Sequence, residues 1–183
     1  MYRSLLIEKN GPVWRVVLNR PEVKNAHDLD MFKEIVEAFD EVESDPDCRC
    51  AVLTGSGNFF CAGQDLRFTR SADAQTADAY GRWNTAARQR IQRNFKPVVA
   101  AVNGPAIGGG AYLATACDLI VAVDTAFFQI REIQSNLLSD GKDGSEKGAI
   151  TRQLDAFGAQ LEKLIDSSFD HENKASALGK LDG

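Results

Sequence analysis

The feature that most constrains this chain is a run of five apolar residues, Val98 to Val102, between Lys96-Pro97 and Asn103-Gly104-Pro105. A strand with no polar residue is buried on both faces, as in a parallel sheet covered by helices. Two further short apolar runs, Cys50 to Thr54 and Leu119 to Val123, are similar. Parallel strands need long crossover connections, so we expect helices between them.

Helical periodicity appears in the intervals between these strands. One amphipathic helix is predicted from apolar residues at helical spacing, with Asp28 as its N-cap and Asp45-Pro46 as its end. The apolar residues of this helix are Leu29, Phe32, Ile35, Val36, Phe39 and Val42. A second helix is predicted over Thr76 to Asn94, and a short one over Ala111 to Ala116. With a hairpin from Ser4 to Leu18 turning at Asn10-Gly11 and a last strand over Ala126 to Ile130, the pattern predicts an α/β fold.

Size and charge limit the possible functions. The 183 residues predict a single domain over 1–183. The 26 acidic residues outnumber the 21 basic ones, for a net charge of −5, which argues against nucleic-acid binding. No apolar run reaches the roughly 18 residues of a membrane span, so we expect no membrane partner and a cytoplasmic location. Four scattered cysteines and two histidines have no metal-ligand spacing, so we expect reduced thiols and no metal.

Two junctions combine a strand, glycines and a helix start: Phe60 to Leu66 and Ala106 to Tyr112. Glycine allows close backbone approach, and free N–H groups at a helix start can bind an anion. Two facing junctions could hold one oxyanion between two backbone donors, although each loop could equally serve tight packing. The spacing matches neither a dinucleotide fingerprint nor a phosphate loop, and no nucleophile-elbow motif is present.

Four segments resemble the motifs of the crotonase, or enoyl-CoA hydratase/isomerase, superfamily, in the family's order. They are Arg20 to Ala26, Ala51 to Leu66, Lys96 to Gly110 and Ala116 to Ala122. The resemblance is close over residues 1 to about 138 and loose beyond.

This resemblance implies a crotonase-like spiral of ββα units and an acyl-CoA thioester as substrate, with no separate cofactor. The thioester oxygen would lie between the backbone N–H groups of Gln64 and Gly109, and the enolate it stabilises is the family's shared intermediate. The residues that match the family's coenzyme A binding region are Lys24, Ala26, Ala62, Asp65 and Leu66.

The positions of the family's two acidic residues bear on the reaction. Tyr112 occupies one of them, and Glu132 occupies the other. Water addition usually uses two carboxylates, whereas proton transfer between C2 and C4 can use one. Glu132 alone therefore favours isomerase over hydratase chemistry. Tyr112 could instead only line the pocket, Glu132 could pair with Arg131, and Asp140 is a further candidate for the site.

The end of the chain departs from the family pattern. Residues 139–152 are more charged than usual for the family and lack a proline. From the resemblance we also expect the chain to lack the family's C-terminal helical segment, which packs on the trimer. We expect exposed apolar surface, with Tyr80 and Trp83 among its candidates, and self-association as a trimer or hexamer. The alternative is a mobile C-terminal half with a poorly ordered 139–147 loop. These departures keep two alternatives open: a catalytically weak acyl-CoA-binding protein, and an interaction module that pairs with a full-length homologue.

Overall fold

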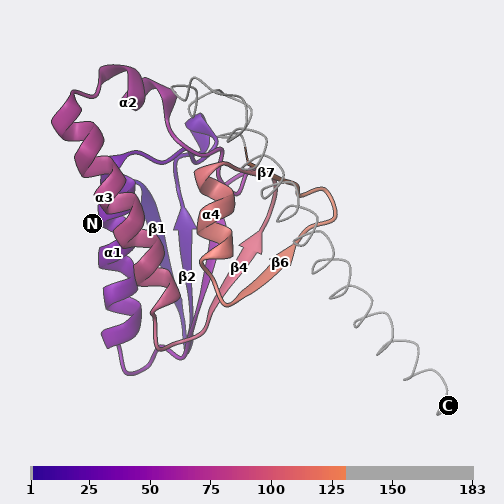
Figure 1. Cartoon of the computed structure of the whole chain (residues 1–183). Coiled ribbons are helices and arrows are strands. Elements are labelled where there is room, and N and C mark those ends of the chain that lie inside the picture. Colours follow the sequence, from indigo (N-terminus) through magenta and orange to yellow (C-terminus); the bar gives the residue numbers. More distant parts are fainter. Residues whose placement is uncertain (1, 131–183) are drawn as a thin grey trace, which may run out of the picture. The chain divides into compact units, whose positions relative to one another are not determined.

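The computed structural model describes residues 2–130 (Figure 1), and the description below is confined to them. The strands are β1 (Leu5–Asn10), β2 (Val13–Leu18), β3 (Cys50–Gly55), β4 (Val98–Val102), β5 (Ala106–Ile107), β6 (Leu119–Ala122) and β7 (Phe128–Gln129). The helices are the 3-10 turn η1 (Pro21–Val23), α1 (Leu29–Ser44), α2 (Leu66–Ser71), α3 (Ala74–Gln92) and α4 (Gly109–Thr115). Strands and helices alternate along the chain, which confirms the predicted α/β class.

The main sheet has the strand order β1-β2-β3-β4-β6. The β1–β2 hairpin is antiparallel and turns at Gly11, whose φ of +59° is the left-handed conformation that glycine favours. The pairs β3–β4 and β4–β6 are parallel, as the apolar runs predicted, and β2–β3 is parallel as well. The burial on both faces expected from such runs does not hold for the edge strand β6, where Leu119 and Val121 are exposed. Parallel strands end at the same side of a sheet, so the segments that follow β2, β3 and β4 gather there. A separate parallel pair is formed by β5, which directly follows β4 in the sequence, and β7, the last strand.

Helices α1 and α3 pack side by side (Figure 1). The Asp28 carboxylate accepts a hydrogen bond of 2.9 Å from the Met31 N–H, which confirms Asp28 as the N-cap of α1. Phe32, Ile35 and Phe39 are among the fully buried residues of this helix. The predicted apolar face of α1 is therefore the face that forms the core.

Several element boundaries differ from the sequence expectation. Helix α3 begins at Ala74 because the Asp73 carboxylate caps it, accepting from the Thr76 N–H at 2.7 Å. Helix α4 begins inside the glycine triplet, at Gly109. The last predicted strand is shorter than expected and comprises only Phe128–Gln129.

The expectation that Tyr80 is exposed was wrong. Its side chain is only 9% exposed, and its ring contacts those of Phe32 and Phe68. Trp83 is half-buried, whereas Phe95, just after α3, is 91% exposed. The predictions for Glu132, Asp140 and the C-terminal half lie outside the described residues.

Candidate functional site

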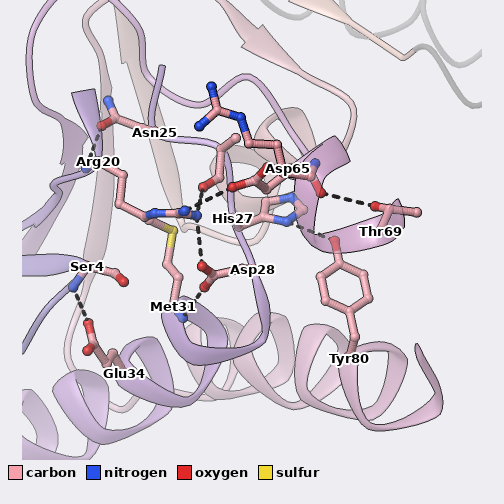
Figure 2. A network of polar contacts seen from close by, with 12 residues as sticks. Ser4, Arg20, Asn25, His27, Asp28, Met31, Glu34, Asp65, Thr69 and Tyr80 are labelled. Carbon is pink, nitrogen blue, oxygen red and sulfur yellow. Dashed lines mark hydrogen bonds and ion pairs between the residues drawn. The ribbon is translucent and has the colours of Figure 1, made fainter. Parts of the chain in front are cut away.

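The segment between β2 and α1 is held in place by buried polar side chains. Arg20 forms ion pairs of 2.9 Å with Asp28 and with Asp65, and donates to the Ala26 carbonyl at 2.7 Å (Figure 2). Lys24 and Asn25 both have positive φ, near +57° and +55°. These contacts join the segment after β2 to the segment after β3.

Asp65 belongs to this structural network. Burial alone would raise its pKa, but the hydrogen bond from the Arg67 N–H and the Arg20 guanidinium outweigh burial, so the pKa lies below its ordinary value. The carboxylate also caps α2 through that Arg67 N–H, at 3.0 Å. Asp65 is therefore ionised and fixes the start of α2.

The residues predicted to bind coenzyme A come together in this region. The Ala62 N–H donates to the Lys24 carbonyl at 3.0 Å, and Ala26 is tied to Asp65 through Arg20. Lys24 is exposed, with its ammonium 4.9 Å from the centroid of the Phe59 ring, and Leu66 is 66% exposed. Lys24 and Leu66 are accessible to a ligand, whereas Ala26 and Asp65 are buried.

The two predicted glycine junctions are neighbours in space. An isolated parallel bridge joins Cys61 to Ala106. Gly63 has a φ of +89°, and a Cβ at this position would lie 2.7 Å from the Ile107 carbonyl oxygen and 3.5 Å from the Gly109 nitrogen. A Cβ at Gly110 would lie 2.8 Å from the Cys61 Cβ. The glycines therefore allow a backbone approach that side chains would prevent.

The predicted oxyanion donors are unused within the described part of the chain. Gln64 lies outside the regular elements, and its N–H has no acceptor among residues 2–130. Gly109 is the first residue of α4, where an N–H has no intrahelical acceptor. The geometry thus leaves two backbone donors available in adjoining loops.

His27 is the residue of this region that the sequence analysis missed. Its side chain is 1% exposed, and its Nδ1 is 2.9 Å from the Tyr80 hydroxyl (Figure 2). Its Nε2 has no hydrogen-bond partner among the described residues. Burial lowers its pKa from 6.5 to about 4, so the imidazole is neutral at pH 7. The only sequence signal was a histidine directly after the Arg20 to Ala26 segment, without a partner at helical or strand spacing.

Tyr112 lies on α4 beside a cation. The ring is half-buried, and the Arg88 guanidinium lies 5.6 Å from its centroid. A cation therefore adjoins the position at which the family carries one of its acidic residues. Glu132, the other position, lies outside the described residues, and its role stays a prediction.

Comparison with known proteins identifies the family. The enoyl-CoA hydratase/isomerase family profile matches residues 8–142. This match agrees with the family that the motifs resemble. The chain belongs to the enoyl-CoA hydratase/isomerase family.

The relatives of this chain are named for different reactions. Enoyl-CoA hydratase EchA19 of Mycobacterium tuberculosis is 39% identical over 139 residues, covering 74% of this chain and 52% of the relative. The peroxisomal Delta(3,5)-Delta(2,4)-dienoyl-CoA isomerase of Arabidopsis thaliana is 34% identical over 154 residues, covering 76% and 55%. The chain spans about half the length of these curated relatives.

Solved structures agree with the fold. An enoyl-CoA hydratase/isomerase from Xanthobacter autotrophicus Py2 has a TM-score of 0.66 at 36% identity, covering 70% of this chain and 49% of the other. One from Mycobacterium paratuberculosis has a TM-score of 0.68 at 31% identity, covering 73% and 55%. These likenesses confirm the crotonase-like fold. Within residues 2–130, no helix is both long and apolar enough to cross a membrane.

Proposed function

We propose that this chain is an acyl-CoA-thioester enzyme that stabilises an enolate between the backbone N–H groups of Gln64 and Gly109. Negative charge grows on the thioester oxygen as the enolate forms. Two fixed donors aimed at that oxygen stabilise the transition state more than the ground state. The observation that carries the proposal is a pair of N–H groups that have no acceptor among residues 2–130, at two junctions that touch through Gly63.

The coenzyme A part would lie along the segment after β2 and the start of α2. Lys24 and Leu66 are exposed there, and Ala62 bonds directly to the Lys24 carbonyl. Lys24 would attract a phosphate of the ligand, while Ala26 and Asp65 would support the loop from beneath. No cofactor besides the coenzyme A of the substrate is needed for this chemistry. We place the protein in the cytoplasm as a homo-oligomer, a trimer or hexamer.

The reaction class is enoyl-CoA isomerisation or hydration. In isomerisation, Glu132 removes a proton from C2 and returns it at C4, so one carboxylate is enough. In hydration, a water oxygen adds to C3 and a proton to C2, which two carboxylates usually share. Tyr112 at the second position favours isomerisation. The names of the relatives include both reaction classes.

A second candidate function is acyl-CoA binding with little catalysis. The observation that favours it is Tyr112 itself, which stands where the family has a carboxylate and has the Arg88 guanidinium 5.6 Å from its ring centroid. An enoyl-CoA turnover assay separates the two candidates. Isomerisation or hydration by the purified full chain supports the enzyme, and coenzyme A binding without turnover supports the second candidate.

Substitution of Gly109 tests the donor pair directly. Gly109→Pro removes the N–H, and Gly109→Ala adds a side-chain carbon at the same place but keeps the N–H. We expect turnover in the proline variant to fall at least about 10²-fold below that in the alanine variant. Steady-state assays measure the difference, and circular dichroism checks that both variants fold.

Gln64→Ala is the matched control, because its donor is backbone and survives the change. We expect it to retain most of the activity. Wild-type turnover in Gly109→Pro, or a Gln64→Ala loss as large as that of Gly109→Pro, would contradict the donor pair.

A further inference from the structure

A single buried residue, His27, adjoins both predicted donors. His27 touches the loop of Gln64 through its backbone and the first residue of α4 through its imidazole. The inference below rests on the proposed function, because it concerns the geometry of the same oxyanion hole.

The backbone of His27 fixes Gln64. The His27 N–H donates to the Gly63 carbonyl at 2.8 Å, and the Asp65 N–H donates to the His27 carbonyl at 2.9 Å. These two bonds form a parallel bridge between His27 and Gln64. In this bridge the two neighbours of Gln64 make the hydrogen bonds to His27. In a parallel pairing of this kind, Gln64 directs its own N–H to the side away from His27. The bridge therefore orients the Gln64 donor.

The side chain of His27 limits the position of Gly109. A Cβ at residue 109 would collide with the imidazole Nε2 and would lie 2.7 Å from its Cε1. The three atoms nearest to that Cβ all belong to the His27 ring. The ring thus packs against the Gly109 Cα, and only glycine fits.

The orientation of the ring is set from its other edge. The Tyr80 hydroxyl is 2.9 Å from Nδ1, and the Phe32 ring stacks at a centroid distance of 4.5 Å. Nε2 faces the C–H bonds of Gly109, which cannot accept a hydrogen bond. A proton on Nε2 would be buried without an acceptor, so the proton belongs on Nδ1, where it is donated to the Tyr80 oxygen. The neutral ring then presents a lone pair to weak C–H donors.

We propose that His27 is a positioning residue of the oxyanion hole, whose backbone orients the Gln64 donor and whose imidazole, held by Tyr80, sets the position of the Gly109 donor. It touches neither the substrate nor the reacting atoms. Its effect is on the separation of the two donors, which must match one oxygen at roughly 2.7–3.1 Å from each. A displaced donor loses stabilisation mainly in the transition state, so the effect belongs in kcat rather than in KM.

A double-mutant cycle between residues 27 and 109 tests the contact. His27→Ala should lower kcat about 10-fold and change KM less than about threefold, because the donors remain but shift. Gly109→Ala should lower kcat by at least as much, since its Cβ meets the ring. In the double variant the new methyl has room, so we expect kcat no lower than in the worse single variant. Additive losses, or wild-type kcat in His27→Ala, would overturn the proposal.

Amide spectra of the ligand-free full chain give a readout that does not depend on turnover. We expect the 1H–15N resonances of Gln64 and Gly109 to shift in His27→Ala, and that of Gly109 to shift in Tyr80→Phe, which keeps the ring but loses the hydroxyl. Val42→Ala is the matched control: it opens the core of α1 at a fully buried residue and should leave both resonances and kcat unchanged. Unmoved resonances in both test variants would overturn the positioning role. A wild-type chain without turnover would count against the proposed function alone, and the spectra would still decide the role of His27.

Discussion

At the scale of single residues, buried polar groups shape the loops at the end of the sheet. Asn25 is fully buried and donates to the Ser56 and Phe59 carbonyls at 2.8 Å each, while its side-chain oxygen accepts from the Arg20 N–H at 3.0 Å. Removing such a side chain would leave several buried backbone groups without partners. The geometry of the loops therefore depends on a few amides and ions, more than on apolar contacts.

The low pKa of His27 leads us to expect a smaller free energy of unfolding on mild acidification. Its pKa is 6.5 in an ordinary setting and about 4 in the folded chain, because burial disfavours the imidazolium. As the pH falls through 6.5, the unfolded chain takes up a proton that the folded chain does not take up until about pH 4. The free energy of unfolding should therefore decrease across this window, by up to about 3 kcal/mol. Urea unfolding at several pH values measures the slope.

His27→Leu supplies the control for this slope, because His171 and all carboxylates are retained. The difference in slope between wild type and variant isolates residue 27. An identical pH dependence in the two proteins would show that His27 does not carry the effect.

Substitution of Glu132 should lower the turnover rate without lowering the affinity for coenzyme A. Glu132→Gln keeps the size of the side chain but cannot accept a proton, so turnover should fall about 10²-fold or more. Binding of coenzyme A, measured by calorimetry, should be unchanged. Glu37→Gln, at an exposed carboxylate of α1, is the control and should be fully active. Full turnover in Glu132→Gln would favour the weakly catalytic alternative.

The sequence indicated the two candidate donors but not the residues that hold them in position. The resemblance to the crotonase motifs named Gln64 and Gly109, and the structure shows that the two glycine junctions that carry them are neighbours. The contact between His27 and Tyr80 could not be predicted, because the two residues lie far apart in the sequence and neither belongs to a recognisable pattern. Arg20 appeared in the sequence only as the first residue of a family-like segment, and nothing there indicated that its guanidinium joins Asp28 to Asp65.

At the scale of elements, the parallel strands were predictable from their continuous apolar runs, and α1 was predictable from its strong helical period. Helix α3 has a weaker one, and its start at Ala74 depends on the Asp73 cap rather than on apolar spacing. Its position depends on Arg90, which donates to the Phe39 carbonyl and pairs with Asp40 and Glu43 on α1. Helix packing thus includes one half-buried cation that periodicity does not indicate.

Arg90→Ala should weaken the packing of α3 on α1. The change leaves the Phe39 carbonyl and two carboxylates without their shared donor, so we expect a loss of about 1–3 kcal/mol in the free energy of unfolding. Arg82→Ala is the matched control on the same helix, since its pair with Asp78 is exposed and such pairs contribute about 0–1 kcal/mol. Urea unfolding measures both. Equal losses in the two variants would show that the contacts of Arg90 add nothing to helix packing.

At the scale of the whole molecule, apolar surface remains exposed at one edge of the main sheet. On β6, Leu119 and Val121 are 62% and 63% exposed, and Val123 and Phe127 follow at 44% and 49%. Alternate residues of a strand point to the same side, so Leu119 and Val121 share one face of the sheet. Contiguous apolar patches of this kind are typical of surfaces that bind another protein.

We expect this surface to be buried by self-association. Light scattering at micromolar concentration should give a mass that is a multiple of 20.0 kDa. Val121→Lys should shift the mass toward that of a single chain, because it puts a charge into the contact. Leu6→Lys is the control: Leu6 is 46% exposed on β1, at the opposite edge of the sheet. A wild-type chain with the mass of one copy would contradict the expectation.

The strand order also determines when each part of the sheet can form during synthesis. The hairpin β1–β2 closes between neighbours in sequence, but β3 joins it only after α1 has been made, and β4 only after α3. Ala51 cannot pair until Val98 has been synthesised, and Val99 cannot pair until Leu119 has been synthesised. A ribosome that adds roughly 5–20 residues per second leaves the free edge of β3 unpaired for several seconds. Nascent chains of this protein are therefore most vulnerable to misassociation between the emergence of Gly55 and that of Val102.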